Sequence, residues 1–396
     1  GILFMLPAGI IWQIYASAHL LFFFMYLASA VFVPFVPMCI ASLLGVLVTA
    51  VSSKFRRKNI VSLVFSFAVL GGLLGIGIYN MQTGASGGSL GVILMEQVSR
   101  LYPLSAWFRY TNYFSLAGNV GFWSLSALVF CIFVKIIECR YARLNSYVLQ
   151  YHAASPGRKA NLKKHSVFTA VYLKEMGRYF SSYLWVLNTG LGVVLLCVTS
   201  LALCVVSPEI LGTYAGIEDV DLFLGQYAPL IIAAMLSISC PAASAISLEG
   251  RNLWVLQSIP LSNKTFIKSK IALTLTVHAI GYMLSVAVFL IRFQFNAIWS
   301  FTLLAVPACY SVFTAVQGTY INCCFPRFDW DNEMVVVKQS ISVILSGVIG
   351  MICIAVPVLL HWFLGLPNVG VLWGMAAILI VLSVILYFKA CGKKII

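Results

Sequence analysis

The stretch SLEGRNLWVLQSIPLSNKTFIKSK, residues 247–270, is polar, yet it separates two long apolar runs. Its large apolar side chains recur at helical spacing: Leu248, Leu253, Trp254 and Leu256. This spacing predicts one short amphipathic helix over residues 249–258, and Pro260 ends it. We expect the stretch to lie at a membrane face, either as an ordinary interfacial loop or as a surface on which a partner acts.

The composition of the chain indicates a membrane protein. Of the 396 residues 61% are hydrophobic and only 9% are charged, whereas soluble domains carry about 25% charged residues. Uncharged runs of about 20 residues cross a bilayer as helices. We therefore expect an all-α polytopic membrane protein with about ten spans, and a tight turn between the first two. The spans are predicted at residues 1–23, 25–53, 59–80, 120–137, 184–206, 227–246, 271–290, 300–321, 340–362 and 369–388.

The basic residues lie in alternate segments between these spans. Such segments hold 22 of the 25 Lys and Arg residues: 54–58, 135–178, 251–270, 327–338 and 389–394. The opposite segments hold only Arg100, Arg109 and Arg292. Since basic residues favour the cytoplasmic side, the first group is predicted to be cytoplasmic. The net charge of +14 then reflects topology, and we expect the lipid bilayer as a partner and no nucleic acid.

A weak internal repeat divides the chain. Val-Pro-Met-Cys at residues 36–39 matches Val-Pro-Ala-Cys at residues 306–309, and Trp123 and Trp373 each begin the last span of a half. Repeats of the same orientation suggest two parallel halves of six helices. The first half shows only four spans here, so we expect an N-terminal piece upstream with two more spans. The predicted domains are a partial first half, a basic cytoplasmic linker and a complete second half, at residues 1–145, 146–171 and 172–396.

The sequence shows neither a P-loop nor a zinc-protease motif. Gly-x-x-x-x-Gly-Lys-Ser/Thr and His-Glu-x-x-His are both absent. His19 and His278 lie in apolar runs without a carboxylate nearby in the sequence. We expect no catalytic, cofactor or metal site in this chain. A membrane-embedded enzyme acting on lipids is a weak alternative, because no paired polar residues are predicted at membrane depth.

Three stretches carry a resemblance to one family. Residues 247–262, followed by Lys268-Ser269-Lys270, resemble the cytoplasmic loop of bacterial ABC-2-type exporter permeases. Residues 174–190 resemble the interfacial elbow helix that leads into the first span of a half, and residues 101–108 resemble the outer segment before its last span. The chain departs from the family in its incomplete first half and in a very short outer segment near its end.

The resemblance implies a permease subunit in the bacterial cytoplasmic membrane, with both half ends cytoplasmic. A separate cytoplasmic ABC ATPase would bind ATP and Mg²⁺, and this chain would hold no cofactor. The loop motif, with Gly250 and Pro260 in it, would be the coupling helix. Leu253 and Trp254 would anchor it in the ATPase, with Glu249 and Arg251 at the rim.

The resemblance also implies roles for the segment before the fifth span. An elbow helix over residues 174–183, including Glu175, would lie flat on the membrane. Its polar and aromatic side chains would face headgroups and the interface: Lys174, Arg178, Tyr179, Phe180, Tyr183 and Trp185. Three residues near the start of the span would face a transport cavity, or would simply pack small polar groups between helices. They are Asn188, Thr189 and Gly190.

The implied activity is ATP-driven export by alternating access of the two halves. The alternative is a secondary transporter with two similar halves, driven by an ion gradient. The lack of a carboxylate in mid-span argues against that alternative, because ion-coupled carriers usually need an ionisable residue there. The sequence does not indicate the substrate.

Overall fold

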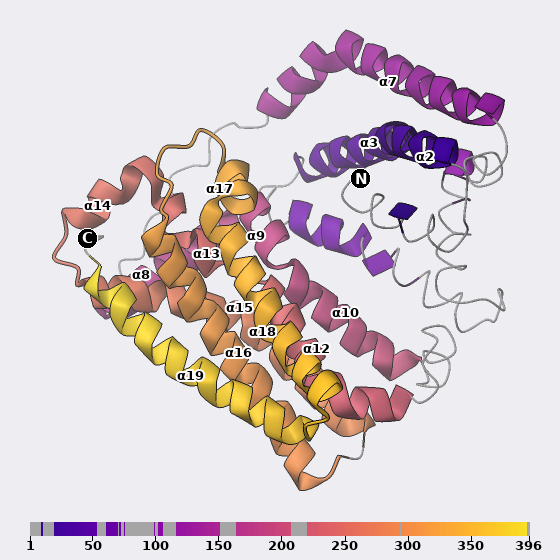
Figure 1. The fold of residues 1–396 in the computed structure, drawn as a ribbon. Helices are drawn as coiled ribbons and strands as arrows, with labels where there is room; N and C mark the ends of the chain where they lie inside the picture. The colour runs from indigo at the N-terminus through magenta and orange to yellow at the C-terminus, as the bar shows by residue number, and fades with distance from the viewer. Residues whose placement is uncertain are drawn as a thin grey trace. The chain divides into compact units, whose positions relative to one another are not determined.

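The computed structural model describes residues 20–53, 61–69, 116–150, 164–206, 220–293 and 295–393, with a few short pieces between them. Every regular element in these ranges is a helix (Figure 1). Two compact units divide the chain: unit 1 comprises residues 1–66 and 79–159, and unit 2 comprises residues 67–78 and 160–396.

The described part contains seven segments that are long and apolar enough to cross a membrane, and a bent helix pair raises the number to eight. The chain is therefore an all-α polytopic membrane protein, as predicted. The number of about ten spans is not confirmed, and the third predicted span, residues 59–80, is described only in part, mainly at residues 61–69. The seven are Phe23–Val48, Leu116–Arg140, Leu222–Gly250, Asn263–Arg292, Ala297–Cys324, Glu333–Leu364 and Asn368–Gly392.

Unit 1 contains three described long helices, α2 (Leu20–Phe32), α3 (Phe35–Ser53) and α7 (Leu116–Gln150), and α7 packs against both of the others. The predicted turn at residue 24 is wrong, because α2 runs through that position. α2 ends instead at Phe32 and α3 begins at Phe35, since a proline disfavours helical backbone at the residue before it. The two helices together make up one candidate span, Phe23–Val48. No residue around position 24 breaks a helix.

Unit 2 is built around α16 (Ala297–Cys324), which packs against five of its neighbours: α12, α13, α15, α18 and α19. The other elements in chain order are α8 (Val167–Ser181), α9 (Tyr183–Thr189), α10 (Leu191–Val205), α12 (Val220–Ile238), α13 (Ala242–Ala245), the 3₁₀ helix η1 (Ser247–Asn252), α14 (Leu253–Gln257), α15 (Asn263–Arg292), α17 (Glu333–Gln339), α18 (Ile341–Leu364) and α19 (Asn368–Gly392).

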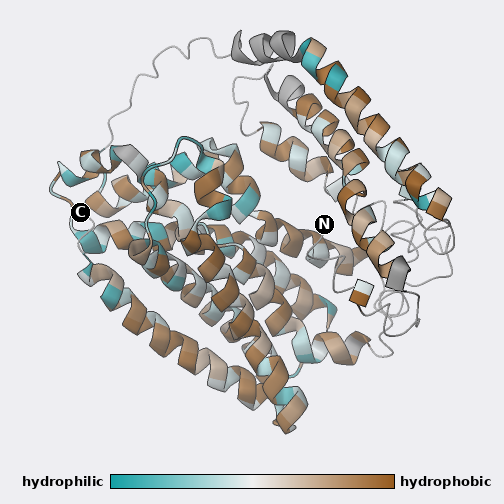
Figure 2. Ribbon diagram, turned by 45° about the horizontal axis from the view of Figure 1, so that its top comes forward, coloured by the Kyte–Doolittle hydropathy of each residue, from teal (hydrophilic) through white to brown (hydrophobic). Residues whose placement is uncertain are grey.

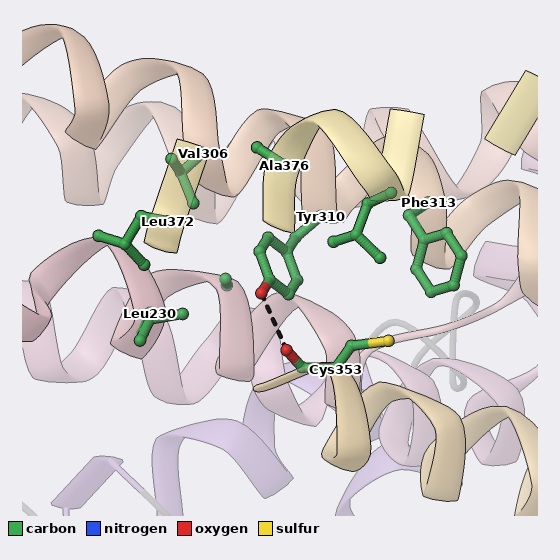
Figure 3. Close-up of a cluster of buried hydrophobic side chains, with 9 residues drawn as sticks. Leu230, Val306, Tyr310, Phe313, Cys353, Leu372 and Ala376 are labelled. Carbon is green, nitrogen blue, oxygen red and sulfur yellow. Dashed lines mark hydrogen bonds between the residues drawn. The ribbon is translucent and has the colours of Figure 1, made fainter. Parts of the chain in front are cut away.

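The core of unit 2 centres on Tyr310 of α16 (Figure 3). Its ring is fully buried among aliphatic side chains of α12, α16 and α19. The buried hydroxyl donates a hydrogen bond to the carbonyl of Cys353 on α18 at 2.9 Å, so its polar group is satisfied. Four long helices of unit 2 thus meet around one side chain.

Unit 2 brings its basic segments to one end, which we call the basic end: α8, η1, α14, the start of α15 and the close of α19. Asn263 joins two of these elements, since its Nδ2 donates to the carbonyls of Cys391 at 2.8 Å and Lys393 at 2.6 Å. Figure 2 shows mainly hydrophobic helices, with hydrophilic residues near the end that carries the C-terminus. At the opposite end, called the distal end, Asn368 of α19 donates to the carbonyl of Gln226 of α12 at 2.8 Å.

One pair of contacts recurs in the two units. In unit 1, Trp123 Nε1 donates to Ser29 Oγ at 2.8 Å, and its ring stacks on Phe32 with 17° between the planes. In unit 2, Trp373 Nε1 donates to Thr302 Oγ1 at 3.0 Å, and its ring stacks on Phe301, again with 17° between the planes. The two Trp residues are matched in the predicted repeat, but their partners are not: Ser29 lies seven residues before Val36, and Thr302 lies four residues before Val306. The repeat therefore stays a prediction.

The predicted division into 1–145, 146–171 and 172–396 stays a prediction. Both edges of the predicted linker are helical, because α7 extends to Gln150 and α8 begins at Val167. Residues 151–163, between these helices, lie outside the described residues.

Candidate functional site

Residues 249–258 do not form the single helix that we predicted. They belong to η1 and α14, and the backbone of η1 is kinked at Gly250, which has φ 54° and ψ −139°. The Trp330 ring lies against this glycine, with ring atoms 3.1–3.2 Å from where a Cβ would stand. Trp330 Nε1 also donates to the carbonyl of Ser247 at 2.8 Å. Because L side chains rarely adopt this conformation, glycine is the residue that permits the break.

Asn322 of α16 holds the start of η1 in place. Its Oδ1 accepts from the backbone N–H groups of Ile246 at 2.8 Å and Ser247 at 3.0 Å. Its Nδ2 donates to the hydroxyls of Ser247 at 2.7 Å and Ser342 at 3.0 Å. All four hydrogen-bonding positions of this buried amide are therefore used.

The α14 helix presents apolar side chains at the surface of the basic end. Trp254 is 64% exposed, and Val255 and Ile259 are each 46% exposed. Leu256 is buried in the chain's own apolar cluster, and Leu253 packs against that cluster. Of the two anchors expected to enter the ATPase, Trp254 is thus accessible and Leu253 faces inward. Beyond Pro260, Ser262 caps α15 by accepting a hydrogen bond from the N–H of Thr265.

Five charged side chains form a cluster at the basic end, here called the ion cluster: Lys174, Glu175 and Arg178 of α8, Glu249 of η1 and Lys270 of α15. Glu175, Glu249 and Lys270 are buried. Lys270 Nζ lies 2.7 Å from Glu175 Oε2 and also pairs with Glu249. Arg178 bridges the two carboxylates at 2.7 Å each. Lys174 Nζ lies 2.9 Å from Glu249 Oε2. Three segments far apart in the sequence are therefore joined by charge.

Three cations share two carboxylates in the ion cluster, and the excess positive charge is spread over other acceptors. Arg178 and Lys270 both donate to the carbonyl of Ala245, at 2.8 and 3.3 Å. Lys270 Nζ lies 4.7 Å from the centre of the Phe266 ring, and the Arg178 guanidinium lies 5.2 Å from that of Trp185. Buried charges persist only when they are paired and hydrogen-bonded. The ion cluster therefore fixes η1 against α8 and α15.

These contacts change the expected roles of several residues. Glu249 was predicted at the rim of a partner contact, but it is buried within this chain. Lys174 and Arg178 were predicted to face headgroups, but they pair with this chain's own carboxylates. The Arg251 side chain lies outside the described part.

The expected elbow helix is also reorganised. It is α8, which ends at Ser181, and Tyr183 instead begins the separate helix α9. Tyr179 and Trp185 are buried against each other, with ring centres 5.0 Å apart, so neither lies at a lipid interface. Burial raises the pKa of Tyr179 to about 12, and a hydrogen bond with Thr189 offsets part of the shift.

Asn188, Thr189 and Gly190 lie where α9 meets α10, at a bend of 55°. Asn188 and Thr189 hydrogen-bond to carbonyls of their own helix, at 2.6 and 2.8 Å. A Cβ on Gly190 would stand 2.7 Å from the carbonyl oxygen of Val186. These contacts are those of packing groups at a helix bend, and a cavity-lining role stays a prediction.

The span that leads into η1 is interrupted at residues 239–241, between α12 and α13. His278 of α15 hydrogen-bonds through Nε2 with the Ser239 carbonyl, and its Nδ1 lies 2.8 Å from the Ser311 hydroxyl. The N–H of Ala242 donates to Thr274 Oγ1 at 3.0 Å. Two side chains of one neighbouring helix, α15, thus satisfy these polar groups at the break, which non-helical backbone requires at membrane depth.

Comparison of the chain with protein-family models, with curated proteins and with solved structures finds no match. The class that fold and composition define is an all-α, multi-pass membrane protein. Within the described ranges no group of three or more His, Cys, Asp or Glu side chains could hold a metal ion.

Sequence reasoning missed Lys270, Asn322 and Trp330, which position the η1–α14 segment. The first two carried a signal. Lys270 directly precedes a long apolar run, and Asn322 closes another. A polar residue at such a place needs a partner.

Proposed function

We propose that this chain is the permease subunit of an ATP-driven transporter, and that α14 is the surface on which a cytoplasmic ATPase docks. The observation that carries the proposal is the exposed apolar group of Trp254, Val255 and Ile259 at the basic end of unit 2. Contiguous exposed apolar groups often mark partner sites, and Trp is the residue most enriched at the centres of such sites.

The ion cluster gives this surface a mechanical connection to the membrane. Because Glu249 pairs with Lys270, a displacement of η1 is transmitted to α15, a spanning helix of 30 residues. Arg178 transmits the same displacement to α8. Closure of an ATPase dimer against α14 would then move these elements together, which is what alternating access by the two halves requires.

The test combines the full chain with each ATPase that bears a Walker A motif and is encoded beside its gene. Affinity is measured for the wild type, for Trp254→Ala and for Trp362→Ala. Trp362 is the matched control, since it is 78% exposed and lies at the distal end. Truncation of a hot-spot Trp costs about 2 kcal/mol or more, so Trp254→Ala should weaken binding about 30-fold. Trp362→Ala should leave the affinity unchanged.

If Trp254→Ala binds the ATPase as tightly as the wild type does, and the unfolding temperatures are unchanged, α14 is not the docking surface. Stimulation of ATP hydrolysis by the full chain in proteoliposomes is the second readout. It tests the ATP-driven class of transport separately from the docking surface.

A secondary transporter is the second candidate, and the interruption at residues 239–241 favours it. Broken helices near the bilayer midplane form the substrate and ion sites of many such carriers. The buried His278 adjoins this break. Transport that follows an ion gradient, persists without any ATPase and is lost in His278→Gln would select this candidate over the first.

A further inference from the structure

The helices α16 and α19 pack against each other, and their last residues bring three free cysteines together at the basic end. They are Cys323 and Cys324 of α16 and Cys391 of α19. Cys323 is buried in an apolar cluster, and Cys391 packs against the same cluster. Cys324 and Cys391 are half-buried, so these two thiols offer accessible surface to a small molecule.

Two hydrogen-bond donors face the thiol of Cys324. The Lys393 ammonium hydrogen-bonds with it, and this contact raises the pKa of Lys393. The second donor is the hydroxyl of Tyr320, one turn earlier in α16. Lys393 Nζ also lies 5.9 Å from the centre of the Tyr320 ring. A nearby cation and hydrogen bonds to the sulfur stabilise a thiolate, which is the nucleophilic form of cysteine.

The fold anchors Lys393 beside this thiol. The Lys393 N–H donates to the carbonyl of Ala390 at 3.2 Å, where α19 ends. The Lys393 carbonyl accepts from Asn263 Nδ2 at 2.6 Å, and the same amide donates to the carbonyl of Cys391 at 2.8 Å. The end of α19 is therefore attached to the start of α15. Because this backbone is already ordered, the contact between the ammonium and the sulfur costs less conformational entropy.

Cys391 provides a comparison within the same group of thiols. It is half-buried, as Cys324 is. Its described side-chain partner is also a tyrosine hydroxyl, that of Tyr387. The Lys393 ammonium is not among its described contacts. The two thiols thus share their partial exposure and a hydroxyl neighbour, and they differ in the cation.

We propose that Cys324 is an oxidation site that reacts with hydroperoxides, and that Lys393 activates it. The thiolate sulfur attacks the terminal hydroxyl oxygen of the peroxide. An S–O bond forms as the O–O bond breaks, and the product is a sulfenic acid. The sulfur is oxidised, the peroxide is reduced, and the departing hydroxide or alkoxide takes a proton from water. Susceptibility to this reaction follows thiolate character and exposure, and Cys324 combines the two. The proposal is independent of the transport mechanism.

The experiment treats the full chain in detergent micelles with a limiting amount of hydrogen peroxide, in the presence of dimedone to trap sulfenic acids. Peptide mass spectrometry then measures the rate of labelling at each cysteine, and Cys324→Ser gives the background. Cys324 should be labelled about fivefold faster than Cys391, which is the effect of one partly exposed charge contact. This comparison uses the wild type alone, so it does not depend on the folding of a variant.

Two lysines of α19 and its end test the role of the cation. Lys393→Gln should slow the labelling of Cys324 about fivefold, and Lys393→Arg, which retains the positive charge, should keep most of the rate. Lys389→Gln is the matched control, because Lys389 is an exposed lysine of the same helix, and it should react as the wild type does. Three outcomes would overturn the proposal: equal labelling of Cys324 and Cys391, an unchanged rate in Lys393→Gln, or an equal loss in Lys389→Gln.

Discussion

Lys270 Nζ lies 2.7 Å from Glu175 Oε2, and both side chains are fully buried. This pair joins α15, a spanning helix, to α8, a helix of the basic end. Each of the other three members of the ion cluster contacts this pair, because Glu249 pairs with Lys270, and Arg178 and Lys174 pair with Glu175. The stability of the region around η1 should therefore fall when any single charge of the ion cluster is removed.

Glu175→Gln should lower the free energy of unfolding by about 3–5 kcal/mol, because it leaves Lys270 buried with one fewer carboxylate. SDS titration in mixed micelles measures this change. The matched control is Glu138→Gln, which breaks the exposed pair Lys135–Glu138, whose side chains are 77% and 63% accessible. That change should cost at most about 0.5 kcal/mol. Equal effects in the two variants would contradict the structural role of the ion cluster.

Gly250→Ala should destabilise the η1–α14 segment by about 1–2 kcal/mol, because an L residue at φ 54° is strained. The added methyl group would also meet the Trp330 ring. Gly177→Ala is the control, since Gly177 lies within α8 with open space around it. That substitution should stabilise the chain by about 0.5–1 kcal/mol. Thermal unfolding compares the two variants, and a shift of the same sign in both would refute the expectation.

Asn322→Leu should leave the N–H groups of Ile246 and Ser247 buried without acceptors. Each such group costs about 1–3 kcal/mol. The expected result is faster amide hydrogen exchange at residues 246–252, with little change at the distal end. Asn322→Asp retains the acceptor oxygen and should preserve more of the protection. If the two variants exchange alike, the Oδ1 contacts are not what holds η1.

Trp123→Phe and Trp373→Phe should each lose one hydrogen bond to a hydroxyl, at a cost of about 0.5–1.5 kcal/mol. The two losses should be similar, because each ring also stacks on a Phe at the same angle. Trp362→Phe, at an exposed site, should change stability by less than about 0.5 kcal/mol. Chemical unfolding of the three variants provides the measurement. A loss of stability in only one of Trp123→Phe and Trp373→Phe would argue against the predicted repeat.

The class and the spans of unit 2 could be predicted from the sequence, because a run of about 20 apolar residues has few alternatives in a bilayer. The runs at 271–290, 300–321, 340–362 and 369–388 each fall inside one long helix, apart from Ser340, which caps α18. Breaks within helices were harder to predict. The interruption at residues 239–241 depends on His278 and Thr274, which lie in another helix.

The ion cluster could not be predicted from the sequence either. Lys174 and Arg178 were predicted to be interfacial residues, because lysine and arginine side chains near span ends usually reach the lipid headgroups. Their partner Glu249 lies 75 residues from Lys174 along the chain, and no local pattern joins the two. The short helix α17 was missed for a different reason: its N-cap, Asn332, is a local signal, but it lies within a loop rich in polar residues.

The interruption between α12 and α13 also constrains the order in which the chain matures during synthesis. The Ser239 carbonyl pairs with His278, and the Ile246 N–H pairs with Asn322, 39 and 76 residues further along the chain. The ribosome therefore delivers this span before its partners exist. Its unpaired backbone groups must be sheltered by water or by the insertion machinery until α15 and α16 arrive. Final closure of the span is consequently a late step of biogenesis, and mutations at His278 or Asn322 should trap the nascent protein where quality-control proteases act.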